Sequence, residues 1–129
     1  SHPAFDGIAP LREWILSHTA PREVLLATNG WWVHRFAGNR PILCATEPRW
    51  NGRVWDEATV LELAERYGAS NLVIYFPAGR PELLDRYGHY LSEVFRNPTS
   101  SDQLELTFRG DNYACYRIVA RTSSVASVP

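Results

Sequence analysis

The chain has 129 residues, of which 45% are hydrophobic and 21% are charged, and its formal net charge at pH 7 is −1. This size and composition fit one globular domain with its own core, which excludes the disordered and fibrous classes of protein. No basic tract is present, and this argues against nucleic acid as a partner, because phosphate backbones are bound by clustered Lys and Arg.

The first half of the chain alternates amphipathic stretches with short, continuously apolar runs. Such apolar runs are typical of strands buried on both faces of a sheet, and EVLLAT is the clearest of them. We expect a helix over residues 10–18, a strand over 23–28, a helix over 31–37 and a strand over 41–45. Residues 46–55 (TEPRWNGRVW) are the least regular stretch and predict a loop.

The second half continues this alternation and then changes character. Asp56 is a good N-cap and Gly68 a good C-cap for a helix between them. We expect next a strand over residues 71–76, a turn over 77–80 and a helix over 81–96. Apolar and polar residues alternate over 104–109, which predicts a half-exposed strand joined by the turn 110–112 to a partner strand over 113–120.

These elements predict a three-layer α/β fold with a Rossmann-like core of three parallel strands. Strands that alternate with helices are joined by right-handed crossovers, which makes them parallel. The C-terminal hairpin is expected to add antiparallel strands at the sheet edge. Residues 1–121 form a single α/β domain in this interpretation, and the small-residue tail 122–129 is expected to be disordered. No apolar run is long enough for a membrane-spanning helix, so we expect this piece of chain to be soluble.

The common catalytic and cofactor motifs are missing from the sequence. There is no G-x-G-x-x-G, no phosphate-binding loop, no G-x-S-x-G elbow and no His pair at metal-ligand spacing. We therefore predict no cofactor, no metal site and no catalytic residue. Cys44 and Cys115 are expected to be buried, and a disulfide between them requires neighbouring strands, because the Cα atoms must approach within about 7 Å.

One group of residues points to binding. In open α/β sheets, ligands lie at the carboxyl ends of the parallel strands, and aromatic and polar side chains follow each predicted strand here. We name the set the Trp-rich rim and treat it as a candidate ligand-binding site: Asn29, Trp31, Trp32, His34, Arg35, Arg49, Trp50, Asn51, Arg53, Trp55 and Arg80. Aromatic rings stack on sugar faces, while Arg and Asn hydrogen-bond hydroxyl or phosphate groups. The competing interpretation is that these Trp residues pack in the core or against a protein or membrane surface.

The order of motifs resembles a known family. Trp14-Ile15, the run EVLLATNGWW, Gly38-x-x-Pro41, Arg66-Tyr67-Gly68 and LVIYF follow one another as in the soluble C-terminal domain of bacterial polytopic glycosyltransferases of the GT-C class, which are related to the dolichyl-phosphate-mannose–protein mannosyltransferases. The resemblance covers about residues 8–120. It implies an extracytoplasmic domain resting on a membrane-embedded enzyme that uses a polyprenyl-phosphate-linked sugar. None of the family's catalytic residues corresponds to a position in this chain, so the fragment alone is expected to be inactive.

Three hypotheses follow. In the first, this is an accessory domain whose partner is the membrane-embedded part of the same polypeptide. The start at Ser1-His2 without an initiator Met is typical of a fragment and agrees with this hypothesis. In the second, it is an independent carbohydrate or small-molecule binding module that uses the Trp-rich rim. The third, a stand-alone enzyme with an unfamiliar site, has the least support from the motifs.

Overall fold

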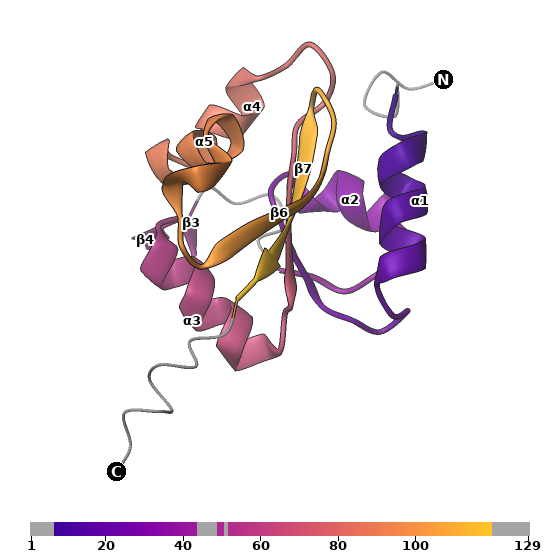
Figure 1. Cartoon of the computed structure of the whole chain (residues 1–129), viewed down its shortest axis with the longest axis horizontal. Coiled ribbons are helices and arrows are strands. Elements are labelled where there is room, and N and C mark those ends of the chain that lie inside the picture. The colour runs from indigo at the N-terminus through magenta and orange to yellow at the C-terminus, as the bar shows by residue number, and fades with distance from the viewer. Residues whose placement is uncertain (1–6, 44–48, 51, 120–129) are drawn as a thin grey trace.

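The computed structural model describes residues 7–43, 49–50 and 52–119. Its helices and strands alternate along the chain as the apolar pattern predicts (Figure 1). In chain order they are α1 (Ala9–His18), β1 (Leu25–Ala27), α2 (Gly30–Phe36), β2 (Ile42–Leu43), β3 (Arg49–Trp50), β4 (Arg53–Val54), α3 (Glu57–Tyr67), β5 (Asn71–Tyr75), α4 (Glu82–Asp85), α5 (His89–Arg96), the short 3₁₀ helix η2 (Pro98–Ser100), β6 (Leu104–Arg109) and β7 (Tyr113–Ile118).

The main sheet has five strands in the order β2-β1-β5-β7-β6. β1 is parallel to both β2 and β5, whereas β7 is antiparallel to β5 and to β6. The predicted mixed α/β class, the parallel pairing of early strands and the edge position of the hairpin are confirmed. Of the two hairpin strands, β7 lies inside the sheet and β6 lies at its edge, which explains why β7 is mostly buried and β6 mostly exposed.

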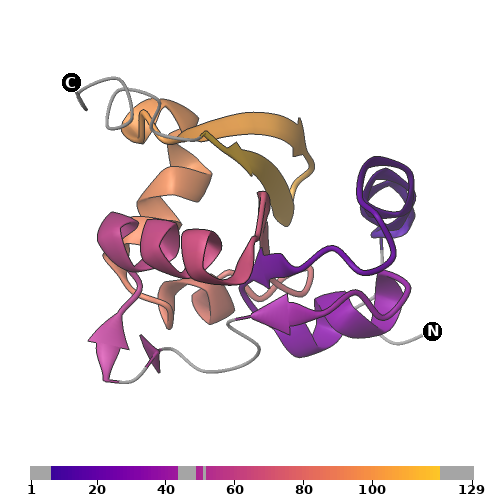
Figure 2. The ribbon, with the colours of Figure 1, turned by 90° about the horizontal axis from the view of Figure 1, so that it is seen from below.

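Helices cover both faces of this sheet (Figure 2). Alternate strand residues point to opposite faces, so the sheet carries two cores. Leu72 and Ile74 point to the core that α3, α4 and α5 close, and Val73 and Tyr75 point to the core closed by α1 and α2. The strands are therefore buried from both sides, as their continuous apolar sequences require.

Three local predictions need correction or limits. The helix expected over residues 81–96 is two helices, because Gly88 has a φ of 97°, which no helical residue adopts. The loop expected over residues 46–55 contains the antiparallel pair β3–β4. Residues 44–45 of the second predicted strand and the tail 122–129 lie outside the described residues.

The two strands that were predicted to contain the cysteines, over residues 41–45 and 113–120, are not neighbours in the described sheet. β1 and β5 lie between β2, the described part of the first of these strands, and β7, which contains Cys115. Cys115 is a free, buried thiol, as predicted, and Cys44 lies outside the described residues.

Candidate functional site at the carboxyl edge of the sheet

The chain order places a topological switch point between β1 and β5. From β1 the chain crosses through α2 to β2 on one side, and from β2 it crosses through α3 to β5 on the other side. α2 and α3 cover opposite faces of the sheet (Figures 1 and 2). Open α/β sheets bind ligands in crevices outside the carboxyl ends of such strands. This edge of the sheet is therefore the candidate ligand-binding site.

Asn29 occupies this switch point but is committed to the fold. It is 6% exposed and holds the left-handed conformation, with φ 48° and ψ 42°, directly before α2. Its Nδ2 donates to the carbonyl oxygens of Tyr75 at 2.8 Å and Leu83 at 3.4 Å. Its backbone N–H donates to Tyr87 Oη at 2.8 Å. Asn29 thus ties the end of β1 to β5 and α4, and its amide nitrogen is not available to a ligand.

On α2, the predicted rim residues separate into exposed and packed side chains. Trp31 is 46% exposed, and the Arg35 guanidinium carbon lies 4.9 Å from the centre of its ring. We call this pair the Trp31–Arg35 surface. Trp32 meets Trp31 edge-on at 4.5 Å and packs against the core beneath α2. His34 Nδ1 donates to the Arg40 carbonyl oxygen at 2.8 Å, which commits that nitrogen to holding the chain before β2.

The described rim residues of β3 and β4 lie beside α3, on the other side of the sheet. The β3–β4 pair stands beside α3, away from α2, in both views (Figures 1 and 2). Arg53 forms an ion pair with Glu62 of α3 at 2.9 Å, and Glu62 also pairs with Arg66 at 3.1 Å. For Arg49 and Trp50 only the backbone in β3 is described, and Asn51 lies outside the described residues.

Two further rim residues lie in different surroundings. Trp55 is 1% exposed and belongs to the core beneath α3, so it packs rather than binds. The indole follows β4 directly, and the sequence could not show that it turns inward. Arg80 is exposed but forms an ion pair with Glu82 two residues away. The structure therefore brings Trp31, Trp32 and Arg35 together, and it does not join them to Arg53 or Trp55.

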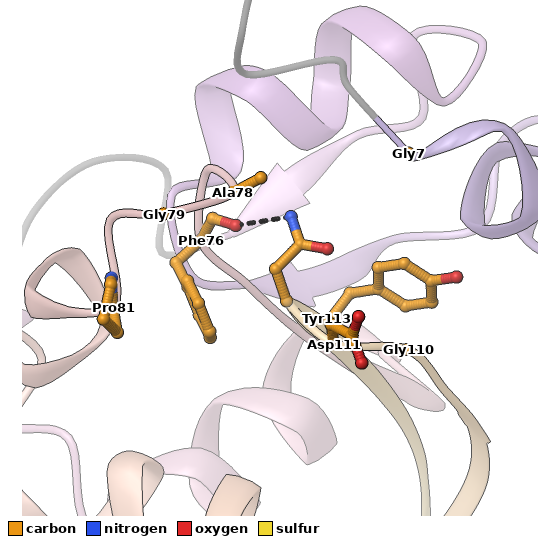
Figure 3. Close-up of a pocket in the computed structure, with 9 residues that line it drawn as sticks. Gly7, Phe76, Ala78, Gly79, Pro81, Gly110, Asp111 and Tyr113 are labelled. Atoms are coloured by element: carbon orange, nitrogen blue, oxygen red, sulfur yellow. Dashed lines mark hydrogen bonds between the residues drawn. The ribbon is translucent and has the colours of Figure 1, made fainter.

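A pocket that the sequence did not predict lies along the same edge, beside β5 and β7. Its volume is about 840 Å³, within the range of roughly 300–1,000 Å³ that small-molecule sites occupy. The segment after β5 lines one side and the β6–β7 turn lines the other (Figure 3). The lining residues are Gly7, Phe76, Ala78, Gly79, Pro81, Gly110, Asp111, Asn112 and Tyr113. Because β7 is antiparallel to β5, the β6–β7 turn reaches the edge where the parallel strands end.

Within the described parts of the chain, no group of three or more His, Cys, Asp or Glu could hold a metal ion. Across the same residues, no helix is both long and apolar enough to cross a bilayer.

Comparison with known proteins finds a likeness in structure but none in sequence. No family model and no curated sequence matches the chain. The crystal structure of the C-terminal globular domain of an oligosaccharyltransferase from Archaeoglobus fulgidus has a similar fold, with a TM-score of 0.52 and 10% sequence identity. The alignment covers 84% of this chain and 94% of that domain. At this identity the likeness shows the fold alone: the helices and strands are arranged as in that C-terminal globular domain.

Proposed function

We propose that this chain is the accessory domain of a membrane-embedded glycosyltransferase. The observation that carries the proposal is the shared fold, because the likeness spans nearly the whole of both domains. The independent resemblance of the motif order to bacterial GT-C enzymes related to protein mannosyltransferases supports the same assignment. The strand order β2-β1-β5, with crossovers on opposite faces, also supports the Rossmann-like description of the core.

In this proposal, the chemistry belongs to the membrane-embedded part of the same polypeptide. The donor is a polyprenyl-phosphate-linked sugar, and the domain sits on the extracytoplasmic face and helps to hold the acceptor. The Trp31–Arg35 surface is the contact we expect with the membrane part, since aromatic side chains and Arg are favoured in buried interfaces. Nucleic acid is not an expected partner, because the formal net charge is −1.

The proposal predicts what the gene encodes upstream of residue 1 and how a deletion variant behaves. The native reading frame should continue upstream of residue 1 into several apolar segments of about 20 residues each. Removal of residues 7–119 from that full-length protein should abolish sugar transfer from a labelled polyprenyl-phosphate donor in isolated membranes. The membrane part should still insert into the membrane, and a tag at its C-terminus would show this by its presence in the membrane fraction. A reading frame without apolar segments, or full transfer by the inserted deletion variant, would overturn the proposal.

The second candidate is an independent carbohydrate-binding module, and the exposure of Trp31 favours it. An indole that is half exposed beside a guanidinium can stack on a sugar ring. In that case sugars should change the tryptophan emission, and Trp31→Ala should remove the change. An unchanged emission at millimolar sugar would exclude this candidate.

A further inference from the structure

The β6–β7 turn presents three oxygen-bearing side chains in succession to the carboxyl-edge pocket. Asp111, Asn112 and Tyr113 all line it (Figure 3). Asp111 is exposed and forms no ion pair with any described residue. Asn112 and Tyr113 are more than nine-tenths buried, at 8% and 6% exposed. Their side-chain oxygens, Asn112 Oδ1 and Tyr113 Oη, are not among the fully buried polar atoms that lack a partner in the described residues, so these two atoms are open to solvent.

Each buried side chain keeps one polar atom without a partner among the residues that the structure describes. Asn112 Nδ2 donates to the Phe76 carbonyl oxygen at 2.8 Å, which fixes the amide and leaves Oδ1 as its remaining acceptor. Neither Asn112 Oδ1 nor Tyr113 Oη hydrogen-bonds to a described residue. Two solvent-accessible oxygens without a described protein partner lie beside a free carboxylate in one hollow, and a ligand with several hydroxyl groups can hydrogen-bond to all three.

The phenol of Tyr113 is held in place from two sides. Its ring stacks on Phe108 at 5.9 Å, and Phe108 in turn stacks on Trp14 of α1 at 5.9 Å. The ring also lies directly against Gly110, where a Cβ atom would overlap the ring carbons and the hydroxyl. The pocket therefore has a preorganised hydroxyl, and Gly110 leaves the room that the ring needs.

Charge decides the class of ligand. Asp111 is the charged residue among the described lining residues, and the other wall is made of Phe76, Ala78 and Pro81. A carboxylate repels phosphate and other anions, whereas it accepts hydrogen bonds from hydroxyl groups. The apolar wall suits the C–H face of a pyranose ring.

We propose that the carboxyl-edge pocket binds a neutral sugar, whose hydroxyl groups hydrogen-bond to Asp111, Asn112 Oδ1 and Tyr113 Oη. This site is separate from the Trp31–Arg35 surface and does not depend on attachment to a membrane enzyme. The sugar, not a phosphate, is the group it recognises.

The test is a titration of the ¹⁵N-labelled 129-residue chain with neutral methyl glycosides of glucose, galactose, mannose and N-acetylglucosamine, followed by NMR. We expect at least one sugar to shift the amide signals of residues 76, 78–80 and 110–113 at millimolar concentration, with the Trp31 indole signal unmoved. Inorganic phosphate at the same concentration should leave these signals in place.

Matched variants connect the shifts to the proposed contacts. Asp111→Asn keeps the shape of an exposed side chain and removes its charge, so the fold should persist while the affinity falls about tenfold or more. Gly110→Ala should displace the Tyr113 ring and weaken binding as well. Asp102→Asn, an exposed carboxylate elsewhere in the chain, should bind like the wild type.

Three outcomes would overturn the proposal. In the first, no sugar of the panel shifts any signal. In the second, the shifts centre on Trp31 and Trp32. In the third, the affinity of Asp111→Asn is unchanged. None of these outcomes bears on transfer by the full-length protein, so this proposal and the proposed function can fail separately.

Discussion

At the scale of single residues, the side chains nearest the switch point hold the sheet edge together. Asn29 bonds three neighbouring segments, through Tyr75, Leu83 and Tyr87. Arg40 has a similar role at the opposite edge, where its buried guanidinium donates to Thr19 Oγ1 at 3.1 Å and to the Thr19 carbonyl oxygen at 2.9 Å. Thr19 ends α1, and a cation at a helix C-terminus is favoured by the helix dipole. Polar side chains that the sequence presents as possible ligand-binding groups therefore form hydrogen bonds that hold neighbouring segments of the fold together.

Substitution of Asn29 should separate its two roles. Asn29→Ala removes the side-chain hydrogen bonds and also puts an unfavourable residue in the left-handed conformation, so we expect a loss of about 2–4 kcal/mol in the free energy of unfolding. Asn29→Gly removes only the hydrogen bonds, and its loss should be smaller by about 1 kcal/mol. Urea unfolding followed by circular dichroism measures both values.

Asn39 is the matched control. It is also left-handed, with φ 58°, but it is exposed, and its side chain forms no hydrogen bond to a distant residue within the described part of the chain. Asn39→Gly should change the free energy of unfolding by no more than about 0.5 kcal/mol. Equal losses at positions 29 and 39 would contradict the role given to the Asn29 side chain.

At the scale of elements, the sequence predicted those with strong local signals. Asp56 and Gly68 bound α3 as expected: Thr59 N–H donates to Asp56 Oδ1 at 2.8 Å, and Gly68 takes the left-handed conformation. The break between α4 and α5 was missed because the apolar spacing of Leu84, Tyr87 and Leu91 continues across it. β3 and β4 were missed because two-residue strands carry no period.

The candidate site was harder to predict than the fold, for a physical reason. Position after a strand indicates an edge, but not whether a side chain points into the core, as Trp55 does, or to solvent, as Trp31 does. The pocket residues 110–113 looked like an ordinary hairpin turn. They could be placed at the carboxyl edge only once β7 was known to run antiparallel to β5, and that pairing is set by tertiary packing.

The cap of α3 gives a pH-dependent prediction. The backbone N–H of Thr59 lowers the pKa of Asp56 below its usual value. A lowered pKa in the folded state means that the carboxylate stabilises the fold above its unfolded pKa of about 3.9, and that this contribution is lost as the pH falls through the folded value. At pH 7, Asp56→Asn should lose about 0.3–1 kcal/mol, since Asn still caps but carries no charge at the helix N-terminus.

The gap between wild type and Asp56→Asn should be smaller at an acidic pH below the lowered folded pKa of Asp56, where both caps are neutral, than at pH 7. Urea midpoints at the two pH values measure this. Glu65→Gln is the control, because that exposed carboxylate lies near the C-terminal end of α3, where the dipole does not favour it. A gap that stays the same at both pH values would show that the Asp56 charge adds nothing.

At the scale of the whole molecule, the two cores share one sheet and should unfold together. Neighbouring residues of β5 belong to opposite cores, so neither core can open without exposing strand residues of the other. A chain of this size with one continuous sheet is expected to unfold cooperatively. The same arrangement lets the carboxyl-edge pocket rest on a rigid support, since its two walls extend from the adjacent strands β5 and β7.

Cys115 offers a direct probe of that cooperativity. Its side chain is buried in the centre of β7, and burial raises the pKa of the thiol to about 12. In a Cys44→Ser variant, the remaining thiol should react with a thiol reagent at neutral pH about a thousandfold or more slowly than in urea, because reaction requires the rarely populated unfolded state. The reaction rate across a urea series should follow the unfolding curve measured by circular dichroism. Rapid labelling under native conditions would show instead that β7 opens locally, and the two cores would then not act as one unit.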